Sequence, residues 1–595
     1  MIELHPGLIL LAGAILVPFL RGVAKSATFV GAPALALLQL FRLSEHSSPT
    51  IEIHGMELVL MKVDNTSQLF ACIFILITLL NAIYMLHKQR SLEYASGLLY
   101  SACTTGVVLA GDFATMFVCW EMLTLCAATL ILAAGMPNAR AVALRYSLVH
   151  VVGGVILMAG IILVTKDQGW AVTTVGLGST GGLLMLIGIG VNCAFPLLHS
   201  WLPDAYSAGS PGGSVFLSAF TTKAAVYVLL RTFPGTEALI WIGCTMAIFP
   251  VLFAVIEDDL RKVLGYSLIN QVGYMVVGIG IGSTWSLNGT ACHAFSHILY
   301  KSLLFMSMGA VLQQTGRSRC TELGGLARYM PWTCGFCIVG AASISAFPFT
   351  NGFISKSMIL SAAGGHEAGV LAHPIAWLVL LLASAAVLKH AGIKVPFFAF
   401  FSHESGLKCE KAPWSMRIAM GAVAFLCIFL GCFPGVIYQH LPDAAAAMDY
   451  HPYTVAHVLS QSQLLVFSAL GFFMLLLAGI YPAEIRCTNL DADWFYRRGG
   501  PVLFACFDRS LNAMNSAAQT IIVGSGLGFA CKLASYGPWS LAVFATAAWH
   551  SVIGTPAEER AKKIDLMRRI GRSHSIPIGF TAALAVLLIF VWWWV

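Results

Sequence analysis

The chain has 595 residues, of which 58% are hydrophobic and only 10% are charged, and its mean hydropathy is +0.81. This composition excludes a soluble globular protein of this size and indicates a polytopic membrane protein. The formal net charge of +7 suits an anionic membrane surface, and no basic patch interleaved with aromatic residues predicts a nucleic-acid partner.

Apolar runs that predict membrane-spanning helices follow one another along most of the chain. They lie near 7–23, 27–42, 66–87, 94–110, 113–134, 139–165, 181–200, 212–233, 237–256, 261–282, 288–314, 331–348, 373–400, 416–437, 462–481 and 576–595. A further short span is an open alternative near 353–364. We expect roughly 14 to 17 helices, because hydrophobic patterns define helix ends poorly.

A lone carboxylate stands deep inside one of these runs. Glu121 lies in MFVCWEMLTLCAATLIL, with apolar residues on both sides. A carboxyl group at that depth is paired, protonated or facing water. The structural alternative is a hydrogen bond between two helices.

Two later segments combine an apolar background with prolines and predict interrupted helices. The first is GVNCAFPLLHSWLPDAY, with Pro196 and Pro203, and Lys223 follows in the middle of the next run. The second is SISAFPFTNGFISKSMIL, with Pro348, and Lys356 stands just beyond it. Interrupted helices near the middle of a bilayer expose backbone groups and dipole ends, and they commonly build transport sites.

One apolar helix carries three titratable residues in register. His293, His297 and Lys301 follow one another at steps of four in ACHAFSHILYKSLLFMSMGAVLQ. That spacing stacks them on one helix face, with about 12 Å between the first and the last along the axis. Such a row predicts a proton or ion pathway. The alternative is three polar residues satisfied within a helix bundle.

A second basic group lies in ASAAVLKHAGIKVPFFAFF, which holds Lys389, His390 and Lys394 before Pro396. The two lysines are five residues apart and therefore lie on different faces of a helix. At most one of them is expected to point along a shared axis, and periodicity does not decide which.

Several segments resemble, in the right order, the antiporter-like subunits shared by respiratory complex I, membrane-bound hydrogenases and Mrp-type sodium/proton antiporters. HAFSHILYKSLLF resembles their HxxxHxxxK helix, and WEMLTL resembles their WE helix. LPDAY resembles the loop after their broken helix, and NGFISK resembles their SGFxSK segment. FTTKAAVYVLLRTF is most similar to the D-type branch of the Mrp subunits, and the resemblance covers roughly residues 60 to 440.

The resemblance implies an all-α polytopic membrane protein with about 14 core transmembrane helices. Two inverted five-helix repeats, each with a broken helix, would each hold half of a charged axis. Four roles on this axis are implied: Glu121 as the carboxylate of the first half, Lys223 as the linking lysine, Lys301 with His293 and His297 as the central relay, and Lys389 or Lys394 as the exit-side lysine.

One departure from the family pattern concerns the first broken helix. Most relatives carry a lysine a few residues before FPLHxWLPDA, where it pairs with the glutamate. Here the corresponding position is Asn192, or Val191 if one extra residue is counted, and neither side chain titrates. Either Lys223 partners Glu121 directly, or the first half-channel is modified or silent.

The tail differs in kind from the core. It mixes apolar and charged residues, ends in the basic segment EERAKKIDLMRRIGR, and is similar to the lateral helix and final anchor of the largest antiporter-like protein of complex I. The basic segment is expected on the cytoplasmic side. Three nearby glycines, Gly524, Gly526 and Gly528, and the Gly537–Pro538 pair predict that the lateral helix is broken or partly re-entrant.

We therefore divide the chain into six parts. They are N-terminal transmembrane helices (1–90), a first half-channel repeat (91–235), a second half-channel repeat (236–405), C-terminal core helices (406–490), a lateral amphipathic segment (491–575) and an anchor helix (576–595).

The predicted function is translocation of protons, or of sodium against protons, by one subunit of a larger complex in the bilayer of a bacterial or archaeal plasma (inner) membrane. No Gly-rich phosphate loop, metal-ligand set or iron–sulfur cysteine set stands out, so we expect no cofactor and no catalytic centre of its own. Driving chemistry, of the NADH/ferredoxin oxidoreductase or hydrogenase type, would belong to partner subunits. The alternatives are a stand-alone cation/proton transporter and a non-conducting scaffold.

Overall fold

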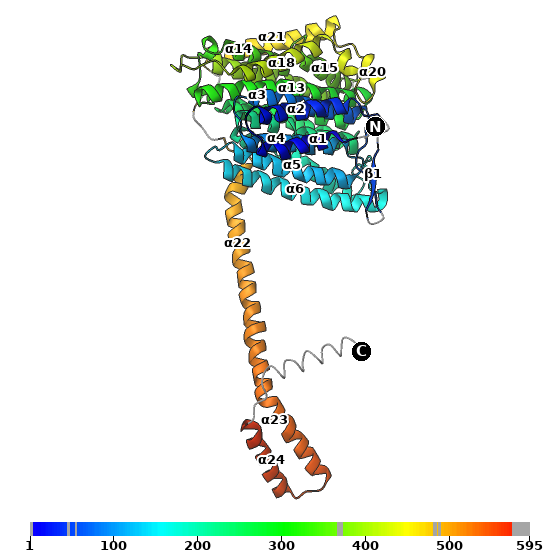
Figure 1. The fold of residues 1–595 in the computed structure, drawn as a ribbon, viewed down its shortest axis with the longest axis vertical. Coiled ribbons are helices and arrows are strands. Elements are labelled where there is room, and N and C mark those ends of the chain that lie inside the picture. The colour runs from blue at the N-terminus through cyan, green and yellow to red at the C-terminus, as the bar shows by residue number, and fades with distance from the viewer. Residues whose placement is uncertain are drawn as a thin grey trace. The chain divides into compact units, whose positions relative to one another are not determined.

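The computed structural model describes residues 4–44, 48–53, 56–365, 373–479, 485 and 489–573. It divides into two units, Met1–Asp493 and Trp494–Val595, and each is considered by itself. The first unit is a bundle of helices that lie side by side (Figure 1). The strands β1 (Thr50–Ile53) and β2 (Met56–Val59) form one antiparallel hairpin beside the bundle.

The first unit is built from three successive groups of helices. The first group is α1 (Pro6–Leu16), η1 (Val17–Phe19), α2 (Gly22–Leu40), α3 (Asn65–Met85), α4 (Ser91–Leu109), α5 (Phe113–Ala133), α6 (Ala139–Gln168) and α7 (Thr180–Asn192). The second group is α8 (Trp201–Ala208), α9 (Pro211–Ala219), α10 (Thr221–Thr232), α11 (Glu237–Ile256), α12 (Leu260–Ile281), α13 (Thr284–Thr315), η2 (Cys320–Glu322), η3 (Leu326–Arg328) and α14 (Pro331–Ile344). The third group is α15 (Asn351–Ala363), α16 (Pro374–Val387), η4 (Leu388–Ile393), α17 (Lys394–Pro396), η5 (Phe397–Phe401), α18 (Trp414–Cys432), α19 (Gly435–Tyr438), α20 (Ala444–Met448) and α21 (Val455–Leu477).

The prediction of a polytopic helical membrane protein is confirmed. Eleven helices of the described ranges are long and apolar enough to cross a membrane, and three shorter apolar helices join them. Two of the shorter ones are α7 and α14, which at 13 and 14 residues are too short to span. At a rise of about 1.5 Å per residue each covers about 20 Å of a hydrocarbon core about 30 Å thick. The open alternative near 353–364 is a real but short helix, α15.

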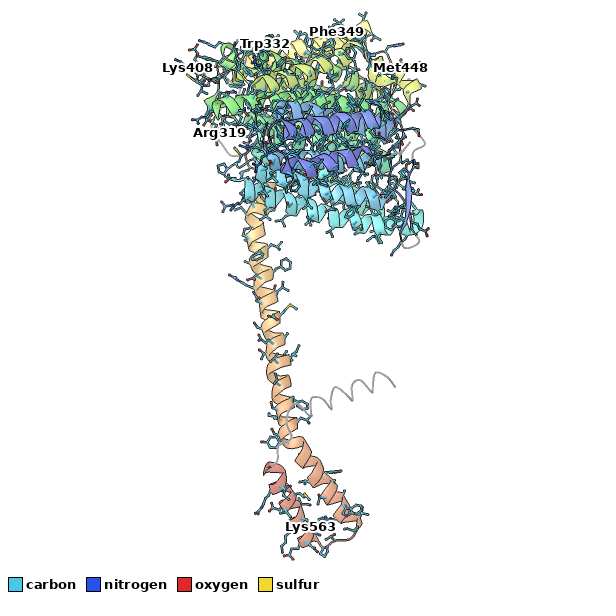
Figure 2. All side chains as sticks on the ribbon, in the orientation of Figure 1. Arg319, Trp332, Phe349, Lys408, Met448 and Lys563 are labelled. Atoms are coloured by element: carbon cyan, nitrogen blue, oxygen red, sulfur yellow. The ribbon has the colours of Figure 1, made fainter. Side chains whose placement is uncertain are left out.

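The two ends of the bundle are marked by labelled side chains in Figure 2. Arg319 and Lys408 lie at one end and Met448 lies at the other, and we name the ends after Arg319 and Met448. Helix α14 follows Arg319 and enters the bundle from the Arg319 end. Helix α7 enters from the Met448 end, because Val175 just before it bonds to the carbonyl of Thr232 at 2.7 Å, where α10 ends. The two short helices therefore enter from opposite ends, as inverted repeats require.

The first break follows Asn192 and uses an unusual backbone. The N–H of Phe195 reaches back to the carbonyl of Gly190 at 3.0 Å and closes the last turn of α7. Ala194 and Leu197 both adopt the left-handed region, with φ of 61° and 70°. That conformation is uncommon for residues with a side chain, and it is sustained only where the surrounding structure enforces it.

The second break repeats this geometry after Ile344. The N–H of Phe347 bonds to the carbonyl of Ala342 at 2.9 Å, and Ala346 and Phe349 have φ of 57° and 66°. The two sequences are AFPL and AFPF, with Pro196 and Pro348 at equivalent places. The equivalence extends from sequence to individual backbone bonds, so the two breaks are one structural motif used twice.

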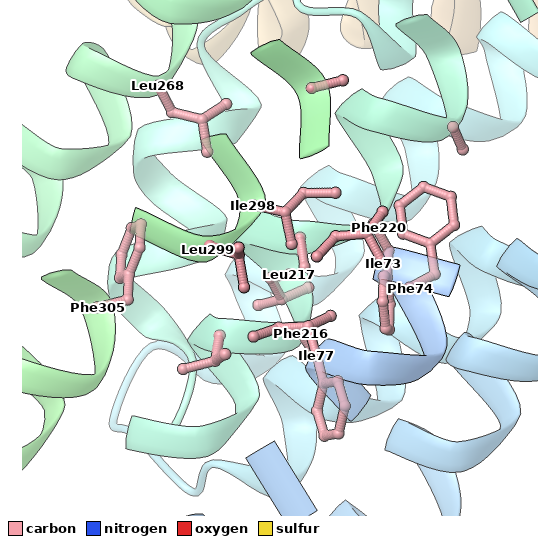
Figure 3. Close-up of a cluster of buried hydrophobic side chains, with 14 of the residues drawn as sticks. Ile73, Phe74, Ile77, Phe216, Leu217, Phe220, Leu268, Ile298, Leu299 and Phe305 are labelled. Carbon is pink, nitrogen blue, oxygen red and sulfur yellow. The ribbon is translucent and has the colours of Figure 1, made fainter. Parts of the chain in front are cut away.

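An apolar cluster fills the middle of the bundle around α13 (Figure 3). Its rings and branched side chains come from α3, α9, α12 and α13, and Phe74 meets Phe220 edge to face at a centroid distance of 5.7 Å. The labelled members are Ile73, Phe74, Ile77, Phe216, Leu217, Phe220, Leu268, Ile298, Leu299 and Phe305. Ile298 and Leu299 follow directly after His297, so one helix presents both an apolar surface and a polar row.

The second unit contains long helices with few breaks. Helix α22 (Asp493–Gln519), the π-helical turn η6 (Thr520–Ser525) and α23 (Gly526–Val552) follow without interruption, and α24 (Ala557–Ser573) comes after a turn. The predicted breaks are wrong: Gly524 lies in the π-helical turn, and Gly526, Gly528 and Pro538 lie inside α23. The chain turns instead at Gly554, whose φ is 68°. The predicted anchor, 576–595, lies outside the described residues.

Candidate functional site: a buried row of titratable residues

Helix α13 carries the predicted row into the centre of the bundle. His293, His297 and Lys301 are all fully buried on this helix of 32 residues. A step of four residues turns an α-helix by about 400°, so the row drifts only slightly around the axis. The three side chains thus share one face, as their spacing predicts.

The polar face of α13 contacts α12 and α15. Lys301 Nζ donates a hydrogen bond to Ser267 Oγ on α12. His293 Nδ1 lies 2.9 Å from Ser355 Oγ on α15, and the hydroxyl of Tyr300 donates to Gln271 Oε1 at 3.0 Å. The bonded partners of His293 and Lys301 among the described residues are neutral hydroxyl oxygens, so dipoles and not carboxylates solvate these two groups.

His297 occupies the middle of the row without a bonded partner. Neither of its ring nitrogens makes a hydrogen bond within the described ranges. Electrostatic interactions nevertheless link it to Lys223, Lys301 and Lys356. A buried imidazole with both nitrogens unsatisfied is uncommon, and it marks a position where water or a mobile proton is expected.

Lys223 lies fully buried on α10, next to the junction with α9. Its ammonium donates to the carbonyl of Ser218 at 2.6 Å and to Thr222 Oγ1 at 3.1 Å. Glu121 does not reach it, and Glu121 Oε1 is buried without a hydrogen-bond partner in the described part of the chain. The hypothesis of a direct Glu121–Lys223 pair is therefore wrong for this conformation, because backbone and hydroxyl oxygens already satisfy the lysine.

The first break leaves a second unsatisfied group. Asn192 ends α7 and is buried, and neither its amide nitrogen nor its amide oxygen has a hydrogen-bond partner among the described residues. The family resemblance leads us to expect a lysine at this position, or at Val191 if one extra residue is counted. The side chain here is uncharged but polar, so the space around it is suited to water.

The second break holds a lysine that the predicted set of site residues omits. Lys356 is buried on α15, and its ammonium donates to the carbonyl of Ile344 at 2.6 Å, at the C-terminal end of α14. The ring of Tyr274 faces the same ammonium at 5.2 Å. A cation at a helix C-terminus complements the helix dipole. The repeated AFPL and AFPF segments were the sequence signal that could have identified this lysine.

The two lysines that the sequence offered for the exit side differ in burial and in bonding, and their role stays a prediction. Lys389 is partly exposed. Lys394 is fully buried and donates to the carbonyls of Val255 at 2.6 Å and Glu257 at 2.8 Å, so it caps α11 at the Arg319 end. Both Lys394 and Lys356 are therefore bonded to a helix end, Lys394 to that of α11 and Lys356 to that of α14.

A cavity of about 500 Å³ opens beside Lys356, between α15, α16 and α21. It leads towards the Met448 end, because Thr454 caps the first turn of α21 and belongs to the lining. Gln461 lines the cavity, and its side-chain amide donates a hydrogen bond to the carbonyl of Ser345 at 3.1 Å. The polar members of its lining are Lys356, Ser357, Ser361, Thr454, His457, Ser460 and Gln461.

The segment just before α22 binds to the Arg319 end of the bundle. Asp491 accepts from Tyr266 at 2.9 Å and pairs with His199 Nε2 at 3.0 Å, and His199 follows the first break. Burial alone would raise the pKa of Asp491, but the hydrogen bond and charge of His199 outweigh it and hold that pKa below its ordinary value. The start of the tail is therefore attached to the residues that follow α7.

The chain is similar to known proteins over most of this bundle. The family described as "NADH:quinone oxidoreductase/Mrp antiporter, TM" matches residues 110–388. The A-type component of the Na(+)/H(+) antiporter of Alkalihalophilus pseudofirmus is 24% identical, over 85% of this chain and 71% of that protein. The D-type component from the same organism is 28% identical, over 57% of this chain and 72% of the relative.

A solved structure has the same fold. It belongs to the Mrp complex from Dietzia sp. DQ12-45-1b, with a TM-score of 0.76, 21% identity, and coverage of 98% of this chain and 74% of that one. The A-type and D-type components both match, so the D-like branch stays a prediction. The matched residues 110–388 contain Glu121, both breaks and the entire row on α13, and the chain is a multi-pass membrane protein that is similar, over these residues, to the family of the NADH:quinone oxidoreductase and Mrp antiporter transmembrane proteins.

Proposed function

We propose that this chain moves protons across the membrane, as one subunit of a larger complex, along the row Lys223–Lys301–His297–Lys356. The observation that carries the proposal is the position of His297. It is a fully buried imidazole, it has no bonded partner in the described ranges, and it lies one helical turn from Lys301 on the same face of α13. A structural histidine would satisfy its nitrogens, whereas a relay has to leave them available.

The row carries protons by mutual repulsion of its charges. Three ammonium groups in a medium of low dielectric constant repel one another strongly, so a proton added at one end favours release at the other. The ammonium of Lys301 donates a hydrogen bond to Ser267. When repulsion from a newly charged neighbour displaces a proton from Lys301, His297 accepts it. Lys356 receives the proton at the second break and releases it into the cavity towards the Met448 end.

The chemistry of the row favours H⁺ over Na⁺ as the transported ion. His293, His297 and Lys301 offer nitrogen bases, which bind protons, whereas hard metal cations prefer oxygen ligands. Movement of Na⁺ would require a separate oxygen-lined path. The relatives belong to membrane complexes, which supports partner subunits that supply the driving force, in the plasma membrane of a bacterium or archaeon.

Lys301 provides the test. In everted vesicles that contain the assembled complex, an imposed potassium diffusion potential drives proton movement, and a fluorescent pH probe records it. Lys301→Ala should abolish this movement while the complex still assembles, and Lys301→Arg should also fail, because arginine does not release its proton. Lys408→Ala, at an exposed lysine, is the matched control. An assembled Lys301→Ala complex that moves protons at the wild-type rate would overturn the proposal.

A further inference from the structure

One buried titratable side chain near the first break has no role in the row described above. His150 lies on α6, fully within the buried stripe of that helix. Its neighbours on the same stripe are Tyr146, Gly153 and Gly154. Nothing in the sequence pattern singled it out, because a histidine in an apolar run is ordinarily a core residue.

The bonding of His150 defines which nitrogen is free. Nδ1 lies 2.9 Å from the carbonyl oxygen of Tyr146, and since a carbonyl only accepts, Nδ1 carries the hydrogen. In the neutral ring the available lone pair is therefore on Nε2. That atom is buried and has no hydrogen-bond partner in the described ranges. A proton acceptor is thus held ready in the interior of the bundle.

Glu121 lies within one helical turn of this acceptor. A Cβ built at Gly154 would be 2.0 Å from Glu121 Oε1, so the carboxyl group occupies the space that a side chain at this glycine would need. Residues four apart on a helix are separated by about 5–6 Å between their Cβ positions. The Glu121 carboxyl group therefore lies against α6 at Gly154, one helical turn from His150, and its Oε1 is also unsatisfied within the described ranges.

A residue that follows the first break packs against the ring of His150. Trp201 meets His150 edge to face at a centroid distance of 4.4 Å, and its Nε1 donates to the carbonyl of Val191 at 3.0 Å. Val191 in turn packs on Gly153, and the next residue is the unsatisfied Asn192. Three unsatisfied buried groups on elements that pack together indicate a polar space suited to water.

On the side of Lys223 a series of contacts begins at the same ring. Tyr146 stacks on His150 at a centroid distance of 3.9 Å, and its hydroxyl lies 3.1 Å from Thr221 Oγ1. The next residue, Thr222, accepts from Lys223 Nζ at 3.1 Å. His150 therefore lies one helical turn from the contact with Glu121 and, through Tyr146, near the residues that bond Lys223, and Glu121 and Lys223 themselves share no bond.

We propose that His150 carries the proton between Glu121 and Lys223. In this chain it would replace a titratable side chain at the end of α7, where the non-titratable Asn192 stands. The O–H bond of the Glu121 carboxylic acid breaks as an N–H bond forms at His150 Nε2, which leaves a carboxylate and an imidazolium. The imidazolium then returns to the neutral ring when Nε2 releases this proton, through water, to the neutral amine of Lys223. This inference rests on the proposed function, because it describes the first half of the same proton path.

The test uses the assembled complex in the everted-vesicle assay described for Lys301. His150→Gln keeps a hydrogen-bonding side chain of similar length but removes the imidazole base, and we expect proton movement to fall at least tenfold with assembly intact. His150→Asn is made in parallel, so that either variant that assembles provides the answer. His451→Gln, at an exposed histidine, is the control and should move protons at the wild-type rate.

A second substitution separates a carrier from a merely structural histidine. Asn192→Lys, combined with His150→Gln, supplies a titratable amine at the unsatisfied position beside Val191 and should restore much of the lost rate. Loss of packing at residue 150 would not be repaired in this way. Full activity of His150→Gln beside an inactive Lys301→Ala would overturn the role of His150 alone, whereas full activity of Lys301→Ala would overturn the proposed function itself.

Discussion

The ammonium of Lys356 donates a hydrogen bond to the carbonyl of Ile344 at 2.6 Å, so a lysine from the helix after the second break caps the helix before it. This bond connects the irregular backbone of the break to the buried row on α13, because the charge of Lys356 also acts on His293 and His297. A proton that leaves Lys356 weakens the cap and the repulsion at the same time. The break is therefore suited to act as the exit of the row.

Arginine at this position should separate the two roles of the lysine. Lys356→Arg keeps a cation for the helix end but cannot release a proton, so assembly should be retained and proton movement should be lost. Lys394→Arg is the matched variant, since Lys394 caps α11 in a similar way, and it should retain most of its activity. Proton uptake by vesicles measures both variants. The opposite ranking would assign the exit to Lys394.

The two histidines of α13 should differ in importance. His297→Ala removes the unsatisfied ring between the lysines and should reduce proton movement at least tenfold. His293→Ala removes a ring that is bonded to Ser355, and water can take its place, so the loss should be smaller. Initial rates at a fixed imposed potential provide the comparison. Equal losses would contradict a special role for His297.

Gly154 should be intolerant of a single methyl group. Because a Cβ there would lie 2.0 Å from Glu121 Oε1, Gly154→Ala should displace the carboxyl group and slow proton movement without removing any titratable residue. Gly471→Ala on α21 is the control, since a Cβ at that position meets nothing within 4 Å. Both changes raise helix propensity by about 1 kcal/mol, so a difference between them reports the clash.

Glu121 and Lys223 should be independent in stability but not in transport. They share no hydrogen bond or ion pair in this conformation, so the melting temperatures of Glu121→Gln, Lys223→Ala and the double variant should shift additively. The losses of transport rate should be non-additive. If the two residues act in series on one path, either substitution alone already interrupts that path, and the second adds little. A large coupling energy in the thermal unfolding of the complex would instead show that the two side chains pair directly in another state.

The second unit should serve assembly and not conduction. On α22 large apolar side chains such as Phe504, Phe507 and Leu511 are exposed along the helix, and they are suited to pack against other membrane subunits. Deletion from Gly499 onward should leave the bundle folded and reduce co-purification of partner subunits. The retained segment keeps Asp491 bonded to Tyr266 and His199. Unchanged co-purification would contradict this role.

Much of the fold and part of the site could be predicted from the sequence, for local physical reasons. Long apolar runs specify helices because the backbone in lipid has to bond within its own segment, and the steps of four that place His293, His297 and Lys301 on one face follow from helix geometry alone. The prolines at 196 and 348 indicated the breaks because proline cannot continue a helix without losing a bond. None of these inferences requires knowledge of which helices are neighbours.

Only the tertiary structure decided which charges meet. Lys356 and Lys394 are both lysines near a proline in an apolar run, yet one reaches the end of α14 beside the row and the other reaches the end of α11. Glu121 and Lys223 are both isolated in sequence, but a glycine on α6 admits the carboxyl group and a carbonyl at Ser218 takes the lysine. The partner of a buried charge depends on which helix end or small residue packs against it, and that is a property of long-range packing that no local pattern of residues contains.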